Sequence, residues 1–171
     1  MLTGWMLAAS VSVWAAAMAG SGGQASLRHL RPRDSLTAVA VAEGVRRSPT
    51  FTALVHAIEA STFIVYTESS RSLTKKMQGC LVHGNIGARY LRVVVKTALP
   101  LDKRIEVLAH ELQHVQEVIE AGISNDPIEM EKLFIRSGYS KHDYGAKGQE
   151  FETVAALQVT ESVRRELQSS R

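Results

Sequence analysis

The pattern of apolar and polar positions predicts five helices, which cover residues 35–47, 48–60, 101–121, 126–136 and 150–168. Gly44 weakens the first of them, because glycine is a poor helix former. The second has a clear start, since Ser48 can cap it and Pro49 suits its first turn. Its apolar residues share one helical face: Phe51, Leu54, Val55 and Ile58.

Three strands are expected at residues 62–67, 79–83 and 89–97, where β-branched and aromatic residues are frequent. The sequence Asn85-Ile86-Gly87 between the last two is typical of a hairpin turn. Pro100 ends the third strand before the long helix. The order of helix, three strands and further helices predicts an α+β domain with a small, mainly antiparallel sheet of about three strands.

The N-terminal segment is apolar and carries no charge before Arg28. Ala17-Met18-Ala19 has the small-residue spacing of a signal-peptidase site, so residues 1–19 are predicted to be an export signal. Residues 20–34 then form a linker, and residues 35–171 form one domain in the periplasm or outside the cell. The segment lacks the usual basic start, so an uncleaved membrane anchor is the alternative.

Composition narrows the classes of function. The chain has 171 residues, 45% hydrophobic and 22% charged, with a net charge of +3, as in an ordinary globular domain. Its basic residues are scattered and do not alternate with aromatic ones, so we expect no nucleic-acid partner. Its one cysteine, Cys80, excludes an internal disulfide and a cysteine-based zinc ribbon.

The predicted helix at 101–121 contains the pattern His110-Glu111-Leu112-Gln113-His114. Two histidines four residues apart lie one turn apart on one helix face, so both rings can reach one metal ion. The intervening glutamate can then hold a zinc-bound water and take its proton as general base. The alternative is a pair of solvated histidines on an exposed helix.

Helical phase supports the metal interpretation. At about 100° per residue, the apolar side chains fall within an arc of about 80°, and His110 and His114 lie on nearly the opposite side. The apolar residues of that arc are Ile105, Leu108, Leu112, Val115 and Ile119.

A catalytic zinc needs a third protein ligand. The metzincin pattern is excluded, because Glu117 and Glu120 stand where it requires glycine and histidine. His142 and Asp143 lie in a polar loop without rigid support, which leaves two glutamates near the start of the last helix. The apolar stripe of that helix consists of Ala156, Val159, Val163 and Leu167.

Glu152 is predicted to lie at the head of this stripe, whereas Glu150 points about 160° away from it. An unpaired carboxylate on a buried face would be costly, so a metal ion is the expected partner of Glu152. The alternative is that Glu152 only complements the helix dipole.

With His110, His114 and the downstream Glu152, the chain resembles the gluzincins, the thermolysin-like zinc metallopeptidases, between about Leu108 and Ala156. The resemblance implies that these three side chains bind one Zn²⁺ and that Glu111 is the general base. The residues around Glu152 depart from the thermolysin pattern. The AHELQH and FET segments are also similar to small exported bacterial proteins of unassigned activity.

We therefore expect an exported zinc-dependent hydrolase, most simply a metallopeptidase with a peptide or protein substrate. The alternative is a non-catalytic binding protein of the cell envelope with a structural or vestigial metal site. The strand around 89–96 directly precedes the motif helix and is expected to be a sheet edge on which an extended peptide binds. Tyr139, His142 or Tyr144 could supply a hydrogen bond to an oxyanion.

Overall fold

The computed structural model describes residues 27–74, 76–83, 89–123, 126–140 and 151–170. The predicted export signal and the hairpin turn at 85–87 lie outside these residues and stay predictions. The described helices are α1 (Ser35–Arg47), α2 (Pro49–Ala60), α3 (Leu101–Glu120), α4 (Pro127–Ser137) and α5 (Val154–Ser169). The strands are β1 (Leu30–Pro32), β2 (Ile64–Ser70), β3 (Gly79–His83), β4 (Tyr90–Lys96), β5 (Tyr139–Ser140) and β6 (Phe151–Glu152).

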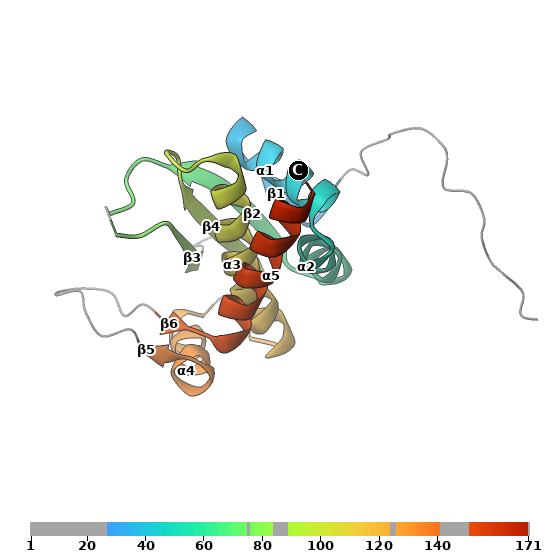
Figure 1. The fold of residues 1–171 in the computed structure, drawn as a ribbon. Coiled ribbons are helices and arrows are strands. Elements are labelled where there is room, and N and C mark those ends of the chain that lie inside the picture. Colours follow the sequence, from blue (N-terminus) through green and yellow to red (C-terminus); the bar gives the residue numbers. More distant parts are fainter. Residues whose placement is uncertain (1–26, 75, 84–88, 124–125, 141–150, 171) are drawn as a thin grey trace, which may run out of the picture.

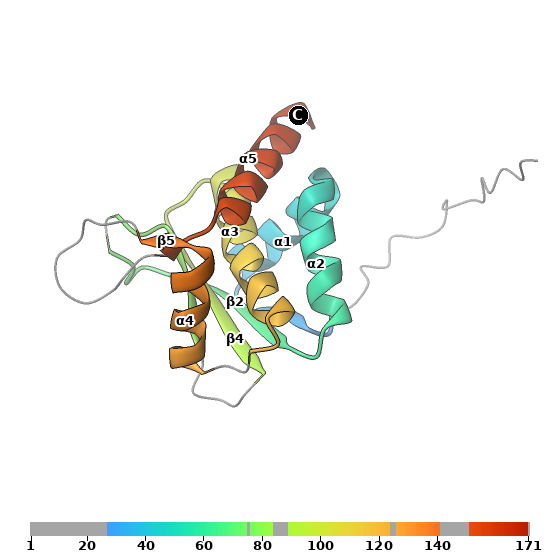
Figure 2. The ribbon, with the colours of Figure 1, turned by 90° about the horizontal axis from the view of Figure 1, so that it is seen from below.

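One four-stranded sheet, in the order β1-β2-β4-β3, carries the helices (Figures 1 and 2). Helices α1 and α3 contact the sheet, and α2 and α5 pack against α3. Beyond the C-terminal part of α3, α4 contacts the small β5–β6 ladder. The largest fully buried side chains come from both layers and include Leu30, Phe51, Ile58, Leu91, Ile105, Leu108 and Leu112. The α+β class is confirmed.

The sheet is mixed, so the expectation of a mainly antiparallel sheet is wrong. β3 and β4 pair antiparallel, as the predicted hairpin requires. β1 with β2 and β2 with β4 pair parallel. Between β1 and β2 the chain passes through α1 and α2, which return it to the end of the sheet where it started, and this connection makes the two strands parallel.

Two further expectations are corrected by the strand order. The predicted linker at 20–34 contains β1, whose Leu30 is fully buried and opposite Val65 of β2. The strand expected at an edge, β4, is central and is paired with β2 and β3. Its run Val93-Val94-Val95 is buried throughout, whereas Arg92, on the same face of the strand as Val94, is exposed. β3 is the edge strand next to it.

Polar side chains fix the starts of the helices. Asp34 caps α1 by accepting from the N–H of Thr37, and its other oxygen accepts from the N–H of Ser69 in β2. Ser48 caps α2 ahead of Pro49, as predicted. No helix in the described part of the chain has both the length and the apolar character needed to cross a membrane.

Candidate metal centre

Helix α3 brings His110, Glu111 and His114 to one place, where the surrounding fold buries Glu111 and His114 and leaves the side chain of His110 17% exposed. Glu111 is 7% exposed and His114 is 5% exposed, so the alternative of solvated histidines on an open helix face is wrong. The two rings are perpendicular, with their Nε2 atoms 3.3 Å apart. Because the residues are one helical turn apart, the helix alone accounts for this proximity.

Glu117 orients the ring of His114. Its Oε2 lies 2.9 Å from His114 Nδ1, and its Oε1 accepts a 2.6 Å hydrogen bond from Thr153 Oγ1. A carboxylate only accepts, so the proton between it and the ring belongs to Nδ1. The neutral ring of His114 therefore presents the lone pair of Nε2 to His110. Phe134 packs edge-on against the same ring.

Thr160 of α5 orients His110 in the same way. Its Oγ1 lies 3.1 Å from His110 Nδ1 and donates a 2.7 Å hydrogen bond to the carbonyl of Ala156. A hydroxyl has one proton to donate, so it accepts from the Nδ1–H of His110. Both rings then direct an Nε2 lone pair toward the same point, which is the tautomer that metal-binding histidines need.

Glu152 lies beside the histidines, although not on a helix. α5 begins at Val154 with Thr153 as its N-cap, and Glu152 belongs to β6. The predicted helix start at residue 150 is therefore wrong. Glu152 Oε2 is nevertheless 3.5 Å from His110 Nε2. Its backbone packs tightly on Gly138, where an added Cβ would lie 2.8 Å from the Glu152 carbonyl oxygen.

Two of the three donor pairs have separations close to those of a zinc site. Two nitrogen ligands of a tetrahedral zinc ion, each about 2.0–2.1 Å from the metal, are about 3.3 Å apart. The Nε2 atoms match this value, and the His110–Glu152 separation of 3.5 Å is close to it. Among the described residues, no group of three or more His, Cys, Asp or Glu side chains is placed so that it could hold a metal ion without some rearrangement.

The surroundings of the pair favour positive charge. Burial lowers the pKa of His114, but the hydrogen bond that its ring donates to Glu117 and the charges of Glu111, Glu117 and Glu152 raise it more, so the net pKa is above its ordinary value. In Glu117, burial raises the pKa, and hydrogen bonds from His114 and Thr153 together lower it further than burial raises it. The carboxylate therefore stays ionised at neutral pH.

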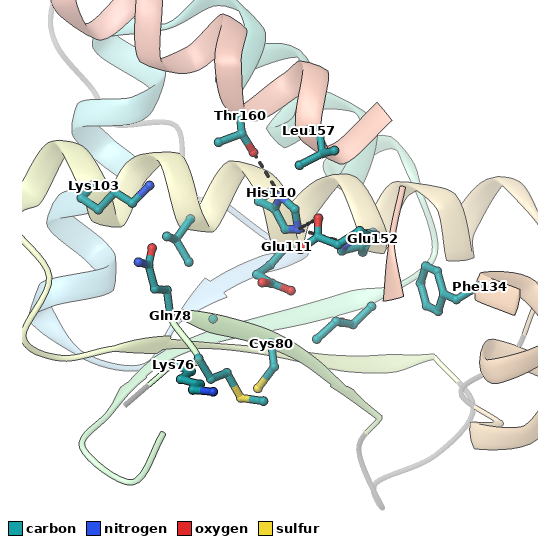
Figure 3. A pocket seen from close by; sticks show the side chains of 15 residues that line it. Lys76, Gln78, Cys80, Lys103, His110, Glu111, Phe134, Glu152, Leu157 and Thr160 are labelled. Carbon is teal, nitrogen blue, oxygen red and sulfur yellow. Dashed lines mark hydrogen bonds and ion pairs between the residues drawn. The ribbon is translucent and has the colours of Figure 1, made fainter. Parts of the chain in front are cut away.

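A cleft of about 480 Å³ opens beside these residues, between α3, α5 and the edge strand β3 (Figure 3). Glu111 reaches its floor and lies against the backbone of Gly79, where an added Cβ would be 2.9 Å from Glu111 Oε1. Lys76, Gln78 and Lys103 lie at one end, and Phe134 lies at the other.

Cys80 also lines the cleft. Burial raises the pKa of its thiol to about 11, and the charge of Glu111 adds to the shift. The thiol is therefore protonated at neutral pH and contributes to the wall of the cleft.

Sequence reasoning missed four residues of the site: Gly79, Glu117, Thr153 and Thr160. A signal was present for two of them, because Glu117 is three residues after His114 on one helix and Thr153 is a good N-cap. His142, Asp143, Tyr144 and Glu150 lie outside the described residues, as does the side chain of Tyr139.

Comparison with known protein families, with curated proteins and with solved structures finds no match to this chain.

Proposed function

We propose that this protein is a zinc-dependent hydrolase that acts on peptides, with His110, His114 and Glu152 as the metal ligands and Glu111 as the general base. One observation carries the proposal. Thr160 and Glu117 lie at the Nδ1 atoms of the two histidines, so both Nε2 atoms, 3.3 Å apart, remain for a shared cation. That cation is a proton in the metal-free protein, and the raised pKa of His114 shows that positive charge is favoured there.

Glu152 completes the donor set with a carboxylate on the same side. Two imidazoles and a carboxylate are a typical ligand set for catalytic zinc, which keeps a further position open. The bound ion supplies Lewis-acid polarisation of a carbonyl and lowers the pKa of a coordinated water to about 7.

Glu111 supplies the proton transfer. It is buried at the floor of the cleft and directly follows His110 in the sequence. In amide hydrolysis it accepts a proton from the attacking water while the oxygen bonds to the carbonyl carbon. When the C–N bond breaks, Glu111 returns this proton to the leaving nitrogen. One water is consumed, and one carboxyl group and one amine are formed.

The edge strand supports a peptide as the substrate. β3 forms one wall of the cleft, and within the part of the chain that the structure describes it pairs with β4 on one side alone. The other side presents backbone N–H and C=O groups, on which an extended peptide can add as a further strand.

Two measurements test the proposal. Elemental analysis of protein purified without added zinc, followed by zinc titration, is expected to give about one equivalent of bound zinc. Glu111→Gln is expected to keep that zinc and to lose turnover of a peptide library. Less than about a tenth of an equivalent, with no uptake on titration, contradicts the metal assignment. A library that the zinc-loaded protein leaves intact favours the non-catalytic binding protein.

A further inference from the structure

The two ends of the cleft differ in chemistry. Lys76, Gln78 and Lys103 lie at one end of the cleft, and Phe134 lies at the other (Figure 3). Leu81, a later residue of β3 than Gly79, also lines the cleft. Among the described residues, the carboxylates that line the cleft are those of Glu111 and Glu152, near its middle. A ligand that spans the cleft therefore meets ammonium groups on one side of the reacting centre and apolar side chains on the other.

Lys103 is held in place to face the cleft. Its Nζ is 3.0 Å from Glu106 Oε2, and Glu106 also lies 3.5 Å from the Nε of Arg164. Lys103 lines the cleft and Glu106 does not, so the ammonium group of Lys103 faces the cleft and the carboxylate of Glu106 lies behind it. An ammonium group has three N–H donors, and Glu106 uses one of them. The others can serve a ligand.

Strand pairing predicts the direction in which a peptide lies in the cleft. An antiparallel ladder is slightly more stable per residue than a parallel one, so a peptide added to the outer side of β3 is expected to run opposite to it. Its residues before the scissile bond then lie beside Leu81 and Phe134. Its residues after that bond lie beside Gln78, Lys76 and Lys103.

From this juxtaposition we propose that the enzyme selects peptides with a carboxylate on the C-terminal side of the scissile bond and an apolar residue on its N-terminal side. This inference rests on the proposed function. The carboxylate comes either from an acidic side chain or from the C-terminus of the peptide, and both have the same chemistry for a lysine.

The test is a set of quenched fluorescent peptides that share an apolar residue before the scissile bond. The residue one or two positions after it is glutamate, glutamine or lysine, and each peptide is made with a free and with an amidated C-terminus. The ratio of kcat/KM for glutamate over glutamine is expected to be about tenfold. If the free C-terminus, and not the glutamate, raises kcat/KM, the carboxylate that the protein recognises is the C-terminus.

Charge variants assign the preference to a residue. Lys103→Gln is expected to abolish it, and Lys103→Glu to reverse it in favour of lysine. Lys132 is the matched control, because it forms the same kind of pair, 2.9 Å from Glu129 Oε1, on exposed α4 and does not line the cleft. Lys132→Gln and Lys132→Glu are expected to keep the wild-type ratio. Zinc content and melting temperature are measured for all four.

Binding of the same peptides to zinc-loaded Glu111→Gln, followed by fluorescence anisotropy, gives a readout without turnover. Tighter binding of the glutamate peptide, lost in the Glu111→Gln/Lys103→Gln double variant, supports the inference. Cleavage without a carboxylate preference, a preference that survives Lys103→Gln, or a carboxylate preferred before the scissile bond overturns it and leaves the hydrolase standing. Binding with the expected preference but no cleavage of any peptide by the wild-type protein overturns the proposed function instead.

Discussion

Thr153 Oγ1 donates a 2.6 Å hydrogen bond to Glu117 Oε1, and this bond joins the two elements that carry the candidate ligands. Glu117 belongs to α3 and also holds His114. Thr153 directly follows Glu152 and caps α5 by accepting from the N–H of Ala156. The placement of Glu152 relative to His114 therefore depends on two side chains that do not bind the metal.

Glu117→Gln is expected to lower zinc affinity about ten- to a hundredfold, the usual cost of removing the partner of a metal-binding histidine. The reason is the number of acceptors: the ring of His114 and the hydroxyl of Thr153 each need one, and an amide has a single oxygen. Competition with a chromophoric chelator measures the affinity. Glu120→Gln is the control, since Glu120 accepts from Gln116 on the exposed side of the same helix. Equal losses in the two variants would contradict a positioning role for Glu117.

Glu152→Gln is expected to weaken zinc binding more than Glu117→Gln does, because it removes a ligand and not the partner of one. Glu161→Gln is the control on the neighbouring helix, where Glu161 is 52% exposed and pairs with Arg164 at 2.6 Å. Zinc titration of the two proteins compares them directly. If Glu152→Gln binds zinc as tightly as Glu161→Gln, Glu152 is not the third ligand.

Gly79→Ala is expected to reduce peptide hydrolysis strongly. The new methyl group would lie 2.6 Å from Val107 Cγ1 and 2.9 Å from Glu111 Oε1, so the edge strand or the general base must move. Gly44→Ala creates a similar overlap away from the site, 2.8 Å from a ring carbon of Phe51.

Overpacking costs about 1–3 kcal/mol, so melting temperatures are expected to fall in both glycine variants. The two variants are expected to differ in activity per folded, zinc-loaded molecule. Gly44→Ala is expected to keep the wild-type value. A Gly79 variant with full activity would show that the close approach of β3 to Glu111 has no catalytic role.

Acid is expected to weaken the anchoring of β1. Glu59 accepts hydrogen bonds from the backbone N–H groups of Arg28, His29 and Leu30 at 2.8–3.0 Å. Burial raises its pKa, but these bonds together lower it more, so the net pKa in the folded protein is below the ordinary value of 4.5. A group with a lowered pKa stabilises the fold above its unfolded pKa, and this contribution is lost as the pH falls through its folded pKa.

Thermal unfolding between pH 7 and pH 3 tests this expectation. Glu59→Gln should melt below the wild type at pH 7, and the gap should narrow as the pH falls below about 4.5. Glu129, which is 48% exposed on α4, is the control position. A gap between Glu59→Gln and wild type that stays constant over the whole range would show that Glu59 does not titrate with folding.

The helices of this protein, and the pair of histidines, could be predicted because their signals are local. Helical spacing places residues i and i+4 on one face whatever surrounds them, so His110 and His114 had to meet if α3 formed. The start of α2 at Ser48-Pro49 and the pairing of β3 with β4 also depend on neighbouring residues. The position of Glu152 beside His110 did not follow from the apolar stripe of α5, because Glu152 belongs to β6 and the helix begins two residues later.

Tertiary structure decided everything that joins distant segments. Strand spacing has the same period in a parallel and an antiparallel sheet, so the order β1-β2-β4-β3 and the identity of the edge strand were not readable from it. The approach of Gly79 to Glu111, the bond from Thr160 to His110 and the position of Lys103 at one end of the cleft arise where separate elements pack. Such contacts depend on how the whole core packs, and the local spacing of apolar residues does not determine this packing.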